Sequence, residues 1–158
     1  MFRLASAATI LGAVLMASGP SSAQVKPKRC LSGTEVATEQ LIRHGVFLRE
    51  ASGRCDEYTP GTKAEWTKFD EANADRLRKQ TDKRAKFFAK EFKADAQKVM
   101  TYFDGRLVTY HRFVPITPAY CRNVQEMLKE IGRRGWGAFT NQAKVVQNEV
   151  YLDYKICQ

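Results

Sequence analysis

Residues 62–103 read TKAEWTKFDEANADRLRKQTDKRAKFFAKEFKADAQKVMTYF, and this stretch decides the fold class. Large apolar side chains recur in it at steps of three and four residues, the spacing that brings them onto one face of an α-helix. They are Trp66, Phe69, Leu77, Phe87, Phe88, Phe92, Val99, Met100 and Phe103. The sequence therefore predicts long amphipathic helices in the middle of the chain.

A single helix over this whole stretch would be about 63 Å long at ~1.5 Å per residue. A compact domain of this size has a diameter of only ~37 Å. The apolar stripe also becomes polar at Gln80 and Arg84. We therefore predict a break near Thr81 and Asp82, where the Asp82 carboxylate can cap the start of a second helix.

Helix boundaries are visible on both sides of this stretch. Ser32 and Glu35 have the spacing of a capping box, and so do Thr62 and Glu65. Thr117 followed by a proline is typical of a helix start. Gly45 is expected to end one helix and begin another. The three glycines of GRRGWG, residues 132–137, are expected to end a later helix. The apolar face of that helix consists of Val124, Met127, Leu128 and Ile131.

The C-terminal segment fits two interpretations. One helical face would carry Phe139, Ala143, Val146, Val150, Tyr154 and Cys157, but residues 150–156 also alternate as in a strand. We favour the longer helical pattern and predict an all-α fold, a small disulfide-stapled bundle of about four to six helices. The alternative is an α+β fold with a two-stranded pairing of 106–114 and 149–156.

The N-terminus has the features of a signal peptide. Arg3 precedes an uncharged apolar run, and Ser21-Ser22-Ala23 fits the small-residue pattern of a cleavage site. The run is shorter than the ~20 residues that span a bilayer. We expect residues 1–23 to be a signal peptide cleaved after Ala23, and 24–158 to form a single helical domain with no transmembrane segment. The expected location is periplasmic or secreted.

Four cysteines lie in the expected mature chain, and none belongs to a CxxC pair. In an oxidising compartment, an even number of cysteines in a small domain indicates disulfides. Three connectivities are open. If the last two helices form an antiparallel hairpin, the preferred pairing is Cys121–Cys157, which leaves Cys30–Cys55 and requires the chain to fold back at Gly45.

Without residues 1–23 the chain has 25 basic and 17 acidic residues, a net charge of +8. Outside the cytoplasm, the anions such a charge meets are membrane phosphates, lipopolysaccharide and acidic polymers, so we expect an anionic envelope component or another protein as partner and no nucleic acid. The densest run, DRLRKQTDKR at 75–84, is interpreted as a solvated helix face, with a functional basic ridge as the alternative.

Candidate contacts for an anionic partner are Arg106, His111, Arg112, Arg133 and Arg134; the last two lie between glycines whose amides can approach an anion. The second histidine, His44, is expected at a helix C-terminus, where a cation is favoured. No HExxH, GxSxG, Walker or paired CxxC pattern occurs, so no catalytic residue, metal site or cofactor is predicted.

These observations favour a secreted, non-enzymatic binding or interaction protein with a basic surface, of an envelope-stress, chaperone-like or inhibitor (immunity) type. The alternative is a small periplasmic enzyme that uses His111 with a nearby tyrosine, such as Tyr110, or a carboxylate.

Overall fold

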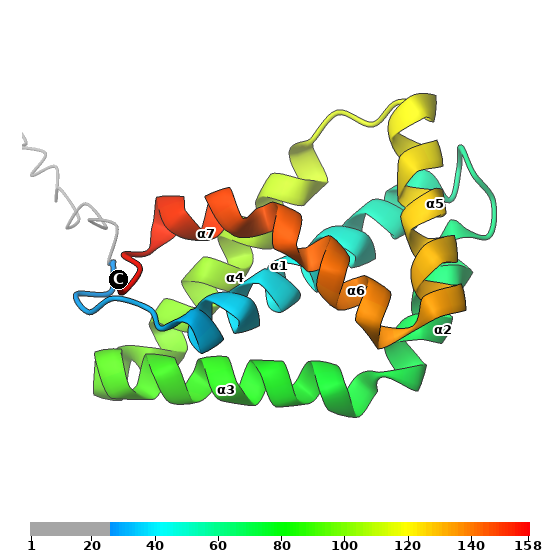
Figure 1. Cartoon of the computed structure of the whole chain (residues 1–158). Helices are drawn as coiled ribbons and strands as arrows, with labels where there is room; N and C mark the ends of the chain where they lie inside the picture. Colours follow the sequence, from blue (N-terminus) through cyan, green and yellow to red (C-terminus); the bar gives the residue numbers. More distant parts are fainter. Residues whose placement is uncertain (1–25) are drawn as a thin grey trace, which may run out of the picture.

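The computed structural model describes residues 26–158, so the expected signal peptide and its cleavage site after Ala23 lie outside the described residues. The described chain is helical almost throughout (Figure 1). Its elements are α1 (Gly33–Cys55), α2 (Thr62–Ala72), α3 (Ala74–Phe92), the 3₁₀ turn η1 (Lys93–Asp95), α4 (Ala96–Phe113), α5 (Pro118–Arg134), α6 (Trp136–Ala143), η2 (Lys144–Val146) and α7 (Gln147–Asp153).

The prediction of an all-α, disulfide-stapled bundle is confirmed. The alternative strand pairing is wrong, because 106–113 belongs to α4 and 149–153 to α7. Ile156 does form a lone parallel β-bridge, but with Leu31 beside the N-terminus of α1. Within residues 26–158, no helix is long and apolar enough to cross a lipid bilayer.

Helix α1 lies at the centre of the bundle and contacts every other α-helix (Figure 1). It begins at the predicted capping box, in which Ser32 accepts from the Glu35 amide and Glu35 accepts from the Ser32 amide. The predicted break at Gly45 is wrong, since α1 continues unbroken to Cys55. A Cβ added at this position would make only ordinary contacts, the nearest with the ring of Phe139 at 3.7 Å.

The predicted break near Thr81 and Asp82 is also wrong. Helix α3 is continuous there, and the chain turns instead at Asn73 and at Lys93, which has a positive φ of 48°. The polar residues that suggested the break face α1: Arg84 is buried against Glu39, and Gln80 accepts a hydrogen bond from a threonine of α1. The polar positions are therefore part of the buried face rather than an interruption of it.

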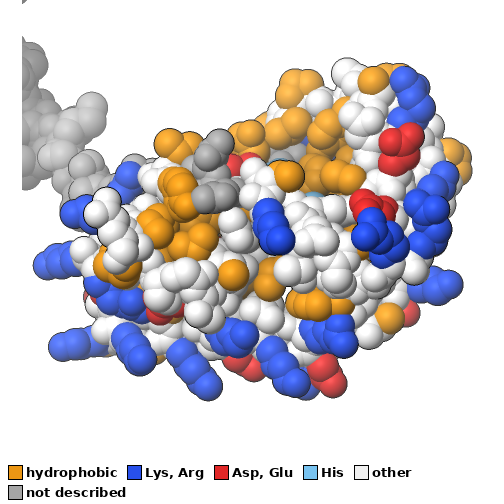
Figure 2. All heavy atoms as spheres, viewed as in Figure 1, with side chains coloured by type: hydrophobic (Ala, Val, Ile, Leu, Met, Phe, Trp, Pro, Cys, Tyr) orange, Lys and Arg blue, Asp and Glu red, His pale blue; other side chains and the backbone are white. Residues whose placement is uncertain are grey.

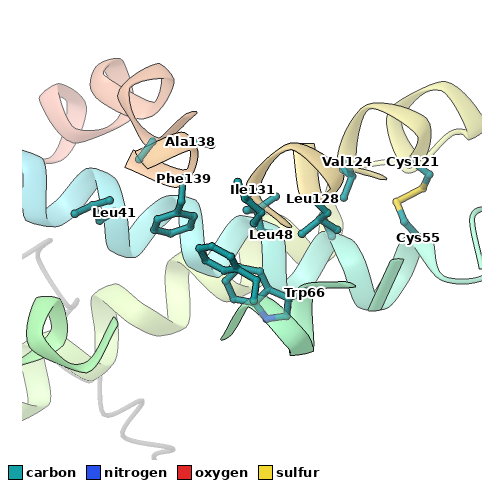
Figure 3. Close-up of a cluster of buried hydrophobic side chains, with 13 residues drawn as sticks. Leu41, Leu48, Cys55, Trp66, Cys121, Val124, Leu128, Ile131, Ala138 and Phe139 are labelled. Atoms are coloured by element: carbon teal, nitrogen blue, oxygen red, sulfur yellow. A yellow bond between two sulfur atoms is a disulfide. The ribbon is translucent and has the colours of Figure 1, made fainter. Parts of the chain in front are cut away.

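Two apolar clusters fill the bundle. The larger one joins α1, α2, α5 and α6 around Leu48, Trp66 and Phe139 (Figure 3), and the smaller one surrounds Phe88 and Phe103 at the other end of α1. Aromatic rings account for much of the buried volume, as expected for a small domain.

A network of charges, buried except at Asp104 and partly at Asp153, joins four helices, and Glu39 of α1 is at its centre. The Glu39 carboxylate accepts a hydrogen bond from Arg84 Nε of α3 at 2.7 Å and lies 3.6 Å from Arg43 Nε. Arg84 also pairs with Asp104 of α4, and Arg43 pairs with Asp153 of α7 at 2.5 Å. The charges of four helices are thus paired around one carboxylate that is 2% exposed.

The disulfides connect Cys30 with Cys157 and Cys55 with Cys121, with Cα–Cα distances of 5.0 and 5.2 Å. The preferred pairing Cys30–Cys55 and Cys121–Cys157 is therefore wrong. Because α1 does not fold back, Cys30 and Cys55 flank a helix about 33 Å long, far beyond disulfide reach. The chain from α6 to α7 returns across α1 and brings Cys157 to the N-terminal end instead. Two disulfides are typical of proteins that fold outside a reducing cytoplasm.

Replacing Glu39 with glutamine removes the one carboxylate that faces both buried guanidinium groups. Breaking a buried ion pair by removing one partner costs about 3–5 kcal/mol, so we expect the free energy of unfolding to fall by that amount in Glu39→Gln. Urea titration followed by circular dichroism measures it. The control Glu126→Gln, at an exposed carboxylate of α5, should stay within about 0.5 kcal/mol of wild type. A loss below about 1 kcal/mol in Glu39→Gln would contradict the role given to this network.

Candidate functional site

Five basic residues form a straight row along α3, which we call the cation row: Arg76, Lys79, Lys83, Lys86 and Lys90. Their spacing of three, four, three and four residues places them on one side of the helix. The row is about 21 Å long at ~1.5 Å per residue. Figure 2 shows basic side chains projecting along the edge of the molecule that α3 forms in Figure 1.

All five residues of the cation row are exposed. Every ion pair among the described residues has an arginine as its cation, so the four lysines of the row have no carboxylate partner within 4.0 Å. Arg76 lies over the ring of Trp136 at 5.6 Å and also has no ion pair. The row therefore presents to solvent five positive charges that form no ion pair within 4.0 Å.

A hollow of about 270 Å³ lies between the row and α1, lined by Lys83, Lys86 and Lys90 on one side. Two carboxylates also line it, but each is already paired. Glu35 forms an ion pair with Arg29, which holds its pKa low, at about 2, and Glu39 belongs to the buried network. The hollow can therefore take an anionic group from outside without meeting an unpaired carboxylate.

The five residues predicted to contact an anion lie in several places. Arg106 pairs with Asp153 at 3.5 Å, and Arg112 pairs with Glu50 of α1 at 2.8 Å. At the end of α5, Arg134 pairs with Glu130 at 2.8 Å, and Arg133 is exposed beside it.

These residues do not form one site. The two arginines of α4 pair with α7 and α1, whereas Arg133 and Arg134 lie at the C-terminal end of α5. Three of the four arginines are already paired with a carboxylate. Binding of an anion by them stays a prediction. The run 75–84 was interpreted as a solvated helix face, with a functional basic ridge as the alternative, and none of its residues was named as a contact. The cation row extends that ridge beyond the run to Lys86 and Lys90.

His111 lies in a second candidate site, a groove between the C-terminal end of α4, α5 and η2. We call it the α4–α5 groove; its floor is formed by α1 and its volume is about 360 Å³. Both histidines of the chain, His44 and His111, line it. Large exposed apolar side chains stand in this part of the molecule, including Tyr110, Phe113 and Val145, which are 60%, 80% and 78% exposed. Figure 2 shows apolar side chains gathered between α5 and the α6–α7 stretch.

Both histidines are buried and favour the neutral form. Burial lowers the pKa of His44 to about 4, against a smaller opposing effect of its hydrogen bond to Gln142. Burial also lowers the pKa of His111, although the charge of Glu50 acts in the opposite direction. The expectation that His44 is a cation at a helix C-terminus is wrong, because it lies in the middle of α1 with 1% of its surface exposed.

A chain of hydrogen bonds orients the His44 ring. Gln142 Nε2 donates to Glu130 at 2.8 Å and to the Met127 carbonyl at 3.2 Å, so its Oε1 must be the atom that faces His44 Nε2 at 3.1 Å. His44 Nε2 is therefore the protonated nitrogen, and Nδ1 is an acceptor. Nδ1 is buried and has no hydrogen-bond partner.

Catalytic chemistry at His111 would need an acid, a base or a nucleophile in contact with its ring. Tyr110 is a neighbour, with ring centroids 5.1 Å apart, but among the described residues no side chain forms a hydrogen bond with the imidazole of His111. The enzymatic alternative stays a prediction. Residues 26–158 also contain no cluster of three or more His, Cys, Asp or Glu side chains placed to bind a metal ion.

Comparisons with protein-family models, with curated proteins and with solved structures found no match for this chain. Proposals about its function therefore depend on the geometry of the cation row and the α4–α5 groove.

The low pKa of His44 makes stability depend on pH. The unfolded chain takes up a proton on this ring near pH 6.5, but the folded chain only near pH 4, so the stabilising contribution is complete above pH 6.5 and is lost as the pH falls towards 4. Between pH 7.5 and pH 5 we expect His44 to reduce the free energy of unfolding by about 2 kcal/mol.

Urea titrations of wild type and His44→Gln at both pH values measure this contribution. The free energy of unfolding should decrease between pH 7.5 and pH 5 in both proteins, and this decrease should be smaller in His44→Gln by about 2 kcal/mol. His111→Gln is the control, because it keeps the His44 ring and should retain that part of the decrease. An identical decrease in wild type and His44→Gln would show that the ring titrates alike in the folded and unfolded chain.

Proposed function

We propose that this protein is a non-enzymatic binding protein of the cell envelope, periplasmic or secreted, whose cation row lies on a phosphate-bearing lipid surface. The observation that carries the proposal is the row itself: five exposed cations on one side of α3, none with a carboxylate partner.

The shape of the row favours a surface over a small anion. Cations in a line about 21 Å long can each approach a different headgroup, whereas a single anion would meet two or three of them at most. The hollow beside Lys83, Lys86 and Lys90 provides a place for one phosphate to enter more deeply. Lysine is a compact charge on a flexible stem, which suits headgroups that have no fixed geometry.

The disulfides support the proposed compartment, since such bonds persist in oxidising surroundings. There the anionic lipids and lipopolysaccharide of the envelope are the abundant phosphate surfaces. In this proposal the basic net charge of the mature chain promotes approach to such a surface, and the row determines which side of the protein faces it.

Binding to vesicles tests the proposal. A basic residue near an anionic lipid surface contributes about 1 kcal/mol, so Lys83→Gln combined with Lys86→Gln should weaken partitioning into phosphatidylglycerol-containing vesicles by about thirtyfold. Binding of wild type should decrease as the salt concentration rises, because the charges are exposed and screened. Vesicle sedimentation at two or three salt concentrations measures both effects.

A charge-matched control separates the row from net charge. Arg133→Gln combined with Arg134→Gln removes the same two charges at the end of α5 and should change partitioning by less than threefold. An equal decrease of vesicle partitioning in the two double variants would show that net charge alone attracts the protein to the vesicle surface. Equal binding of wild type to anionic and purely zwitterionic vesicles would refute the proposal.

A further inference from the structure

The hollow between α1 and α3 adjoins the cation row, and its volume of about 270 Å³ has room for a phosphate group. We propose that this hollow binds the terminal phosphate of a phosphomonoester lipid in preference to the bridging phosphate of a phosphodiester lipid. The inference rests on the proposed lipid-surface function and deepens it, because it names the headgroup that the protein recognises on that surface.

The side of the hollow formed by α3 is cationic. Lys83, Lys86 and Lys90 line it, and all three are exposed. Among residues 26–158, none of these lysines has a carboxylate partner. They follow one another at steps of three and four residues on one side of the helix. Because their stems are flexible, the three ammonium groups can converge on one anion in the hollow.

The other charged groups that line the hollow are already paired. Arg84 Nε lies 2.7 Å from the Glu39 carboxylate, and the Glu35 carboxylate lies 2.5 Å from Arg29. In total, four cations and two carboxylates line the hollow, so the lining residues carry a net charge of +2. A dianion balances this charge, whereas a monoanion balances only half of it.

A phosphomonoester matches this lining in charge and in hydrogen bonding. It carries about −1.5 to −2 charges at pH 7 and has three terminal oxygens that accept hydrogen bonds. The phosphate of a diester carries a single charge and has one such oxygen fewer. Each lysine has three donors and no acceptor. Three lysines can therefore give every terminal oxygen of the monoester a charge-assisted hydrogen bond.

The side of the hollow formed by α1 adds a neutral donor. Thr34 is exposed in the first turn of α1 and lines the hollow. Its hydroxyl forms no hydrogen bond within the described part of the chain, so it can donate to a phosphate oxygen. The hydroxyl of Thr38 is already in use, because it donates to the Thr34 carbonyl at 3.1 Å.

The shape of the hollow also favours a terminal phosphate. Two helices enclose it, and the buried side chains of Leu31 and Phe87 are among its lining residues. The phosphate of a monoester is the end of its headgroup, so it can enter between the helices without any other group. The phosphate of a diester has a substituent on both sides, and the second substituent would have to enter together with it.

Sedimentation of the mature protein with two kinds of vesicles tests the inference. Both contain phosphatidylcholine, and they differ in the anionic lipid: phosphatidic acid is a phosphomonoester, and phosphatidylglycerol is a phosphodiester. The anionic lipids are added in amounts that give equal zeta potentials, so that the general attraction of the cation row is the same for both. We expect wild type to bind the phosphatidic acid vesicles about tenfold more tightly.

Two double variants locate this preference. Lys83→Gln combined with Lys86→Gln removes two charges that line the hollow and should reduce the preference to less than about threefold. Arg76→Gln combined with Lys79→Gln removes two charges of the row that do not line the hollow. It should weaken binding to both kinds of vesicles and keep the preference of about tenfold. Circular dichroism checks that both variants are folded.

Glycerol 3-phosphate distinguishes a lipid headgroup from a free phosphomonoester. In amide NMR without vesicles it should shift the signals of residues 34–38 and 83–90 with a dissociation constant of about 1 mM or weaker, because it leaves the rest of the row without contacts. Micromolar binding would assign the hollow to a soluble phosphomonoester and overturn the assignment to a lipid. Saturating amounts that shift no signal at the hollow would overturn the site itself.

The vesicle results separate this inference from the lipid-surface proposal. Equal binding of wild type to the two kinds of vesicles would overturn the inference and leave the lipid-surface proposal standing. An equal loss of the preference in the two double variants would overturn it as well, because the preference would then come from the whole row rather than from the hollow. An absence of binding to either kind of vesicle would overturn both.

Discussion

The ion pair between Glu39 and Arg84 is the interaction on which the rest of the structure depends. It joins α1 to α3 in the interior, and through Arg43, Asp104 and Asp153 it extends to α4 and α7. Desolvation of these charges is costly unless each finds a partner of opposite sign with good geometry. The paired charges therefore favour this packing of α1, α3, α4 and α7 over one that leaves Arg43 or Arg84 buried without a carboxylate.

The two candidate sites follow from this packing. Arg84 turns inward to Glu39, while the five residues of the cation row face outward along one side of α3. On the other side of α1, the returning chain of α6, η2 and α7 pairs with Arg43 and leaves a groove against α4 and α5. The groove is lined by residues of several elements and exists only in the folded bundle, whereas the row needs α3 to be helical along its length.

Local patterns in the sequence predicted the helical class, the cap at Ser32 and the helix start at Thr117, all confirmed, because these depend on neighbouring residues. One local prediction is wrong: the N-cap of α2 is Gly61, with no side-chain cap hydrogen bond, so Thr62 and Glu65 do not form the predicted capping box. The other errors concern contacts between distant residues. A polar residue such as Arg84 in an apolar stripe suggests a helix break. The residue that pairs with it inside the bundle, Glu39, lies 45 positions away in the sequence, so the local pattern does not show that Arg84 is buried. The disulfide pairing and the burial of His44 depend in the same way on the path of α6 and α7 across α1, which no local spacing encodes.

We propose that the protein presents α3 to an anionic lipid surface and keeps the α4–α5 groove turned away from it. Amide NMR of the mature protein with phosphatidylglycerol nanodiscs tests this arrangement most directly, because one experiment measures the signal changes of all helices. The account predicts that signals of residues 76–90, with the facing start of α1, broaden or shift first, and that signals of the groove remain unchanged. Perturbation centred on Arg133 and Arg134, or on the groove between α4 and α5, would contradict it.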